Sequence, residues 1–249
     1  MNTPAPTLEA LFKALDFDRP LDVDNPADRA LYVPNLHRSN GINPVDELRG
    51  NIEISDRPGT WLFTGHRGVG KSTELRRMAY ELRQQGHLVV VADMGEYLNL
   101  AEPINTELLL LTMVAALADG ADRYLGGQRL GASYAQRLWN WLSSTEVQLT
   151  GVDAQLSLGE NKLSFKTLLK ENPEFRQRVV KAVAASVGRL YSQAKIFVKQ
   201  IADEVAANSQ YGAGKQVILV LDSLERLRVT GADAWPRLAA SAVVPKVKA

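Results

Sequence analysis

The sequence of 249 residues contains no cysteine, which excludes disulfide bonds and thiolate metal sites. Its formal net charge is only +1, so no excess of one sign indicates binding to nucleic acid or to a membrane surface. The first residues lack the basic and then apolar layout of a signal peptide. The longest apolar stretch, residues 108–117, is too short to cross a bilayer. These absences predict a cytoplasmic globular protein without a membrane partner.

One motif dominates what is present. Gly65-His66-Arg67-Gly68-Val69-Gly70-Lys71-Ser72 fits the G-x-x-x-x-G-K-[ST] pattern of a phosphate-binding loop. Residues 60–64 are predicted to form a short buried strand that enters this loop. After it, apolar residues recur with the spacing of one helix face, and Gly86 is a suitable helix end. Strand, glycine-rich loop and helix in this order predict a nucleotide site.

The residue types of the loop suit the chemistry of phosphate binding. Backbone N–H groups and the helix dipole favour negative charge there, and glycines let the backbone approach oxygen atoms closely. Lys71 is predicted to reach the β- and γ-phosphates, and Ser72 to bind Mg²⁺. His66 and Arg67 occupy variable positions and are expected to point outward. The predicted nucleotide-binding residues are Gly65, His66, Arg67, Gly68, Val69, Gly70, Lys71, Ser72 and Thr73.

A second apolar run, residues 217–222, ends in Asp222. An aspartate at the carboxyl end of a parallel strand is predicted to hold Mg²⁺ through water. Glu225 follows three positions later, where it is predicted to polarise the attacking water as general base. A surface carboxylate at a helix start is the simpler interpretation of Glu225. Glu96, beyond the apolar run of residues 88–93, is a second candidate base.

The order of apolar runs and amphipathic segments predicts an α/β fold with a parallel sheet flanked by helices. We divide the chain into an N-terminal arm (1–43), the first part of the nucleotide-binding core (44–100), a mostly helical insertion (101–210) and a magnesium-strand segment with a tail (211–249). Asn43-Pro44 is predicted to start a helix. The insertion is predicted to contain helices at 107–117 and 134–142, a β-hairpin at 146–166, and one long helix at 173–207 with an apolar seam.

The loop and the segment Asp222-Ser223-Leu224-Glu225-Arg226 resemble an AAA-like group of P-loop NTPases. This group comprises the signal-transduction ATPases with numerous domains (STAND) and their NACHT and KAP relatives. In those families a small residue follows the magnesium aspartate and a second acid comes two positions after it, as Ser223 and Glu225 do here. The resemblance covers about residues 45–228. It implies ATP and Mg²⁺ as cofactors, and a switch in which ATP binding and hydrolysis control self-assembly or a protein partner.

The segment after Asp222 departs from this pattern. ATPases of the group continue with another strand, inserted between the loop strand and the magnesium strand, and with a helical lid that carries an arginine. Residues 229–249 are rich in Ala and Val and are broken by Pro236 and Pro245, and they indicate neither element. We therefore expect a core that is truncated or completed by another polypeptide, with the binding residues present and the hydrolytic assembly incomplete.

Other interpretations are open to the sequence. A GTPase needs Asn-Lys-x-Asp for guanine, and Asn161-Lys162-Leu163-Ser164 lacks the aspartate. Residues 156–160 echo a transporter-ATPase signature, but a long helix separates them from Asp222. Two alternatives to an ATP-dependent regulator are kept: a non-catalytic protein that binds a partner through its long helix, and a DNA-linked ATPase subunit.

Overall fold

The computed structural model describes residues 20–34, 36, 41–55, 57–66, 68–125, 137, 165–184, 187–207, 215–226 and 228–229. Three of the predicted features therefore lie mainly outside the description. They are the helix at 134–142, of which only Arg137 is described, the hairpin at 146–166 and the tail after residue 229. Arg67 of the loop is also outside the described residues.

The two strands predicted from apolar runs form a parallel pair. Strand β1 (Leu88–Asp93) lies beside β3 (Val217–Asp222) in a register that pairs Leu88 with Val217 and Asp93 with Asp222. The predicted α/β class with a parallel sheet is confirmed to this extent. A second parallel pair, β2 (Pro103–Ile104) with β4 (Arg228–Val229), was not predicted, because two-residue strands carry no periodic signal.

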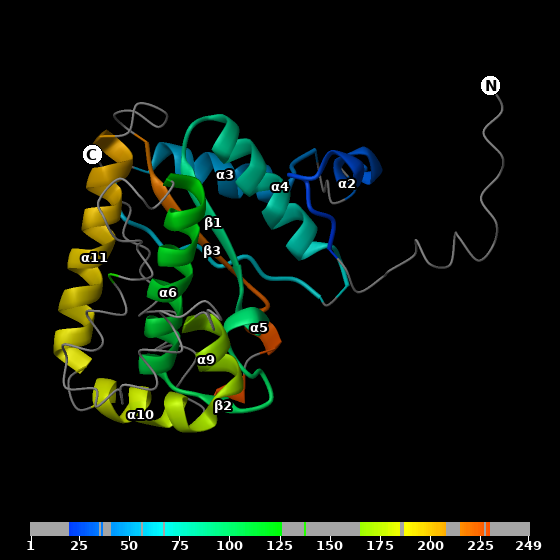
Figure 1. Cartoon of the computed structure of the whole chain (residues 1–249). Coiled ribbons are helices and arrows are strands. Elements are labelled where there is room, and N and C mark those ends of the chain that lie inside the picture. The colour runs from blue at the N-terminus through cyan, green and yellow to red at the C-terminus, as the bar shows by residue number, and fades with distance from the viewer. Residues whose placement is uncertain are drawn as a thin grey trace.

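Helices cover both faces of the β1–β3 pair (Figure 1). Helices α3 (Pro44–Ile54) and α4 (Lys71–Gln84) lie on one face, and α6 (Thr106–Leu125) and α11 (Val187–Ala207) on the other. Successive residues of β1 point to opposite faces, so that Val89 packs with α3 and α4, while Val90 packs with α6 and α11. Because both faces of the β1–β3 pair are covered by apolar side chains of helices, the sequence of each strand is a continuous apolar run and does not alternate with polar residues.

The helices that flank the loop begin and end where local signals place them. Asn43 caps α3 by accepting a hydrogen bond from the Val45 N–H, and Pro44 is the first helical residue. Helix α4 ends before Gly86, whose φ of 86° lies in the left-handed region that glycine adopts without a steric penalty. Both predicted helices are confirmed, as is the helix predicted at 107–117, which extends to form α6.

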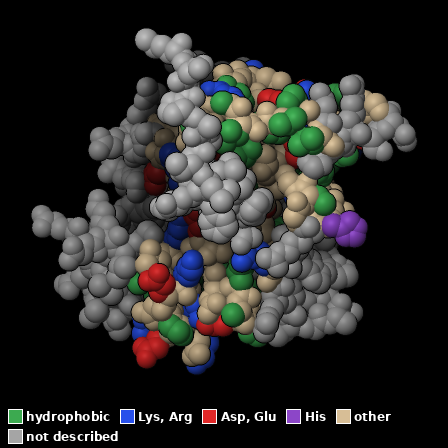
Figure 2. All heavy atoms as spheres, turned by 90° about the vertical axis from the view of Figure 1, so that its right-hand side faces the viewer, with side chains coloured by type: hydrophobic (Ala, Val, Ile, Leu, Met, Phe, Trp, Pro, Cys, Tyr) green, Lys and Arg blue, Asp and Glu red, His purple; other side chains and the backbone are tan. Residues whose placement is uncertain are grey.

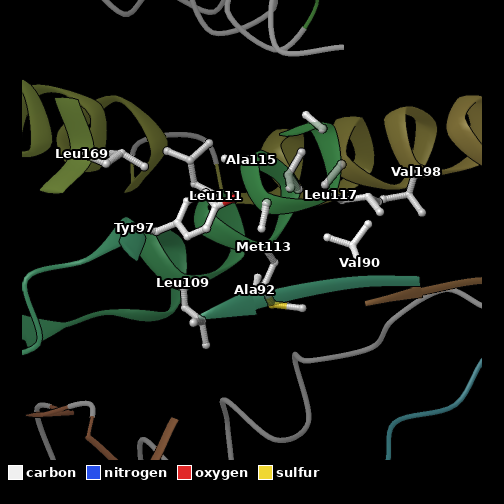
Figure 3. Close-up of a cluster of buried hydrophobic side chains, with 14 of the residues drawn as sticks. Val90, Ala92, Tyr97, Leu109, Leu111, Met113, Ala115, Leu117, Leu169 and Val198 are labelled. Carbon is white, nitrogen blue, oxygen red and sulfur yellow. The ribbon is translucent and has the colours of Figure 1, made fainter. Parts of the chain in front are cut away.

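The larger core lies between the sheet and the helical layer of α6, α9 (Phe165–Glu171), α10 (Pro173–Ala184) and α11. Figure 3 shows Val90 pointing from β1 toward α6, with Leu117 and Val198 nearby. The short helix α5 (Met94–Tyr97) follows β1 directly and packs on α9. None of the helices in the described part of the chain is long and apolar enough to cross a lipid bilayer.

The strand predicted at residues 60–64 is wrong: this segment forms no strand. Trp61 and Phe63 are half-buried against the α3–α4 core, whereas 73% of Leu62 is exposed. Apolar content suggested burial on both faces, but neither β1 nor β3 offers this segment a ladder of backbone hydrogen bonds. Without such a partner, an apolar run does not become a strand.

The long helix predicted at 173–207 is also wrong in its extent. Helix α10 ends at Ala184, and α11 begins at Val187. Figure 1 shows α10 lying across the end of α6 and α11 running along it, so the two segments pack in different directions. The predicted seam holds in α11, where Ala194, Ile201 and Val205 are buried in the core shared with α6. Phe165, predicted to belong to the hairpin, is instead the first residue of α9.

A half-buried carboxyl group beside this core makes the free energy of unfolding depend on pH. The hydroxyl of Tyr97 donates to Asp119 Oδ2 over 3.0 Å. Burial raises the pKa of Asp119, and this effect is opposed by the hydrogen bond from Tyr97 and by the charge of Lys166. In the unfolded chain the Asp119 carboxyl has an ordinary pKa of about 3.9. Above that pH, folding opposes the ionisation of this carboxyl. The stability contributed by Asp119 is complete below about pH 4 and is lost as the pH rises through the folded pKa.

We expect Asp119→Asn, which cannot ionise, to be more stable than the wild type at pH 7 and to lose this advantage below about pH 4. Urea unfolding at the two pH values measures the difference. Asp203→Asn is the control, because Asp203 is exposed on α11 and pairs with Lys199. Its effect should stay within about 0.5 kcal/mol at both pH values. A wild type that is more stable than Asp119→Asn at pH 7 would contradict the assignment.

Candidate functional site

Two glycines of the predicted phosphate loop, Gly68 and Gly70, occupy backbone conformations that other residues avoid. Gly68 has a φ of 81° and Gly70 a φ of 85°, both in the left-handed region. Gly70 is also the residue that precedes α4, and its carbonyl accepts the Glu74 N–H, the first hydrogen bond of the helix. The loop therefore turns directly into the helix, so that the first N–H groups of α4 face the loop.

Helix α4 starts without a side-chain cap, unlike its neighbours. Asn25, Asn43 and Asp93 each accept a backbone N–H at the start of α2 (Pro26–Leu31), α3 and α5, respectively, whereas no side chain does so for α4. The N–H groups of Lys71, Ser72 and Thr73 precede the first intrahelical donor, Glu74, and have no acceptor within the helix. N–H groups that lack an acceptor within the helix and the positive end of the helix dipole favour an anion at this position.

The ammonium group of Lys71 lies over the loop. Its Nζ donates to the carbonyl oxygens of Gly65 and His66, each over 2.9 Å. The lysine stem also packs beside Gly65, whose absent Cβ would lie 3.6 Å from Lys71 Cδ. An ammonium has three donors, so one remains for a further acceptor while both carbonyl bonds are kept. Lys71 thus places a positive charge inside the turn that residues 65–70 make.

The two halves of the predicted site meet at Ser72 and Asp222. Ser72 Oγ donates to Asp222 Oδ1 over 2.9 Å, although the two residues are 150 positions apart in the chain. The Ser223 N–H donates to the same carboxylate oxygen over 2.9 Å. Asp222 is only 6% exposed, so these bonds stabilise a carboxylate that has lost most of its water. The structure therefore brings the loop hydroxyl and the strand-end acid into direct contact.

Two features near Asp222 were not predicted from the sequence. Asp93 ends β1 in register with Asp222, and its Oδ1 accepts the Gly95 N–H over 2.8 Å. Ser223 has a φ of 66°, a conformation that non-glycine residues rarely adopt. The sequence did contain a signal for Asp93, because it ends an apolar run just as Asp222 does. Nothing in the sequence indicated the backbone conformation of Ser223.

The remaining predicted residues are placed as follows. Glu225 belongs to the 3₁₀ turn Leu224–Arg226, but its side chain lies outside the described residues. The side chain of Glu96 is 58% exposed and forms an ion pair with Lys166 of α9. His66 and Val69 are exposed on the loop, as expected for variable positions. Thr73 is half-buried, and its hydroxyl accepts the Leu21 N–H over 3.2 Å, a contact that the sequence did not predict.

The oxygen atoms of Ser72 and Asp222 are hard ligands of the kind that Mg²⁺ prefers. Among the described residues, no group of three or more His, Cys, Asp or Glu side chains could hold a metal ion. Mg²⁺ normally binds through one or two protein oxygens together with water and substrate phosphates, and not in an all-protein cage. The Ser72–Asp222 pair fits that donor set.

The chain matches no family model, and neither the curated proteins nor the solved structures contain a protein that it matches.

Proposed function

We propose that this chain binds ATP with Mg²⁺ at residues 65–73 and Asp222, and that it hydrolyses ATP as a regulatory switch of the P-loop NTPase type. The contact between Ser72 Oγ and Asp222 Oδ1 carries the proposal. A chance glycine-rich turn gives no reason for its serine to meet a buried acid 150 positions later. A magnesium–nucleotide site needs these two groups side by side, next to the N–H groups at a helix start.

Each residue has a separate role in this proposal. The N–H groups at the start of α4 and the Lys71 ammonium hold the phosphate oxygens and stabilise the charge that develops during transfer to water. Ser72 and Asp222 would hold Mg²⁺ beside the phosphates. Glu225 accepts a proton from the attacking water. When bound, Mg²⁺ would neutralise negative charge on the phosphates.

The alternatives retained from the sequence gain less support. In the α11 seam, Ala194, Ile201 and Val205 are buried in the core shared with α6, and Phe197 is half-buried against that core. These residues are therefore already covered and do not form a free face for a partner helix. In Figure 2, basic, acidic and hydrophobic side chains are interspersed over the described part of the face that carries α2. A DNA-linked ATPase would favour a continuous basic stripe. These observations support neither a partner helix on the α11 seam nor DNA on the described part of this face.

We expect calorimetric titration to show that ATP binds in the presence of Mg²⁺, and that GTP binds more weakly. Glu225→Gln should keep the wild-type affinity for ATP and lose turnover, because the amide cannot take a proton from water. Glu96→Gln is the matched control: Glu96 pairs with Lys166, so turnover should stay unchanged. Loss of turnover in Glu96→Gln alone would move the general base to Glu96. Absence of ATP binding by the wild type would refute the proposal.

A further inference from the structure

The described part of the N-terminal arm folds back on the helix that follows the phosphate loop. We name residues 20–32 the strap; it contains α2 (Pro26–Leu31), and Figure 1 shows α2 beside α4. Within it, the Asp22 N–H donates to the buried carboxylate of Asp28 over 2.9 Å, and Val23 is buried. The strap is therefore an ordered element with its own internal bonds.

Both ends of the strap meet the first turn of α4. At one end the Leu21 N–H donates to Thr73 Oγ1 over 3.2 Å, and at the other end the Tyr32 hydroxyl donates to Glu74 Oε1 over 2.7 Å. Between these ends the strap contacts the later turns of the helix, where Arg29 lies over the Tyr80 ring and Asp24 pairs with Arg83. Both ends of the strap are thus hydrogen-bonded to the first turn of α4, the turn that directly follows the phosphate loop.

Glu74 is held in place by charge as well as by Tyr32. It is 3% exposed, and its Oε2 accepts a hydrogen bond from Arg77 Nε over 3.1 Å. The same guanidinium also donates from Nη2 to Asp46 Oδ1 of α3 over 2.9 Å and from Nη1 to Glu81 Oε1 of α4 over 2.7 Å. An acid buried next to a phosphate site would repel the ligand if it were not neutralised. The contacts to Tyr32 and Arg77 remove that obstacle and fix the position of the first turn.

The hydroxyl of Thr73 is oriented differently from that of a helical threonine in the core. Thr112 in α6 donates its hydrogen to the Leu108 carbonyl one turn earlier. Thr73 instead accepts a hydrogen bond from the strap, and within the described part of the chain no acceptor takes its hydrogen. A hydroxyl has one hydrogen and two lone pairs, so acceptance from Leu21 leaves the hydrogen for another oxygen. Thr73 lies in the first turn of α4, among the N–H groups that have no acceptor within the helix.

We propose that the strap and the phosphate site are coupled through Thr73 and Glu74, so that docking of the strap strengthens binding of a nucleotide polyphosphate and the nucleotide strengthens docking of the strap. This inference rests on the proposed function. Leu21 and Tyr32 are positioning residues that act through Thr73 and Glu74, respectively. The coupling is reciprocal: if strap docking raises the affinity for the nucleotide by some factor, the bound nucleotide raises the equilibrium constant of strap docking by the same factor.

Two measurements test this coupling. Hydrogen exchange of the Leu21 amide is followed with and without saturating ATP and Mg²⁺, and protection should rise about threefold to tenfold when ATP binds. The dissociation constant of ATP is measured by calorimetry for Tyr32→Phe, which should bind about threefold to tenfold more weakly than the wild type. Asp24→Asn weakens the strap far from the loop and should shift the affinity in the same direction by a smaller factor.

A matched control is available elsewhere in the chain. Tyr97→Phe also removes a phenol that donates to a carboxylate, that of Asp119, but Tyr97 lies in the core on the α6 side of the sheet. Tyr97→Phe should leave the ATP affinity unchanged. At saturating ATP, Thr73→Val should abolish the gain in Leu21 protection, and Thr73→Ser should restore it, because serine keeps the hydroxyl.

The outcomes separate this inference from the function on which it rests. ATP binding with an unchanged Leu21 amide, or Tyr32→Phe with the wild-type affinity, would overturn the coupling and leave the nucleotide site standing. Equal losses of ATP affinity in Tyr32→Phe and Tyr97→Phe would show that the effect of Tyr32→Phe comes from lower overall stability, and would overturn the coupling. A wild type that binds no ATP would refute the proposed function and the coupling together.

Discussion

Lys71→Ala is expected to weaken ATP binding by at least about 100-fold and to abolish turnover with it. The Lys71 ammonium lies within the loop turn, at 2.9 Å from the carbonyl oxygens of Gly65 and His66. Hydrogen bonds from a charged group are worth about 1.5–3 kcal/mol each. The one donor that the two carbonyls leave free and the Coulomb attraction between the ammonium and the phosphate charges together account for the expected loss. Alanine would also leave the loop carbonyls facing the phosphates without a compensating positive charge.

The loss of binding can be separated from a loss of structure. Lys71 is half-exposed and bonds to carbonyl oxygens of its own loop, so Lys71→Ala should melt within a few degrees of the wild type. Lys199→Ala removes the same charge from an exposed position on α11, where the lysine pairs with Asp203. That control should keep both the wild-type affinity and stability. An unchanged ATP affinity in Lys71→Ala would refute the site.

Gly120→Ala is expected to destabilise the fold by about 1–3 kcal/mol, although alanine is the better helix former. A Cβ at Gly120 would lie 2.2 and 2.5 Å from the two γ-carbons of Val90. These distances are far inside van der Waals contact, so α6 or β1 must move to admit the methyl group. Because β1 is paired with β3 along its whole length, a shift of β1 disturbs the strand that ends in Asp222. Urea unfolding measures the effect.

Two comparisons make the steric cause testable. Gly50 also lies within a helix, α3, but a Cβ there would meet no atom within 4 Å. Gly50→Ala should therefore stabilise the protein by about 0.5–1 kcal/mol. The double variant Gly120→Ala, Val90→Ala should be less destabilised than the sum of its two single variants, because the γ-carbons are gone. Strict additivity would contradict a direct clash between the two positions.

Much of the local structure could be predicted from the chain because its signals are local. The apolar runs at 88–93 and 217–222 are strands, and the Asn-Pro pair before Val45 starts α3. The same pair occurs at Asn25-Pro26, where it starts α2, so the described part of the arm carried a usable signal. Each of these patterns works through hydrogen bonds and dihedral preferences within a few residues.

The errors occurred where a distant partner decides the outcome. Residues 60–64 resemble a buried strand in composition, but a strand needs a neighbour with which to share backbone hydrogen bonds, and the run itself does not say whether one is present. The helix predicted at 173–207 had the right periodicity along its length. It is divided because α10 packs on α9 and α6 while α11 packs along α6 and beside β3. Periodicity indicates which face of a helix is apolar, but it does not indicate where one helix ends and the next begins in another direction.

The sequence by itself determined the chemistry that is available: a glycine-rich turn, a lysine and a serine at a helix start, and an acid at the end of an apolar strand. Those choices follow from residue type and spacing, since φ freedom, charge and hydroxyl chemistry belong to single residues. Tertiary structure alone decided that Ser72 meets Asp222, that Asp93 lies in register with Asp222, and that the strap bonds to Thr73 and Glu74. These contacts join residues from 42 to 150 positions apart, and they exist because burial of apolar faces on both sides of β1 and β3 sets the distances between the elements.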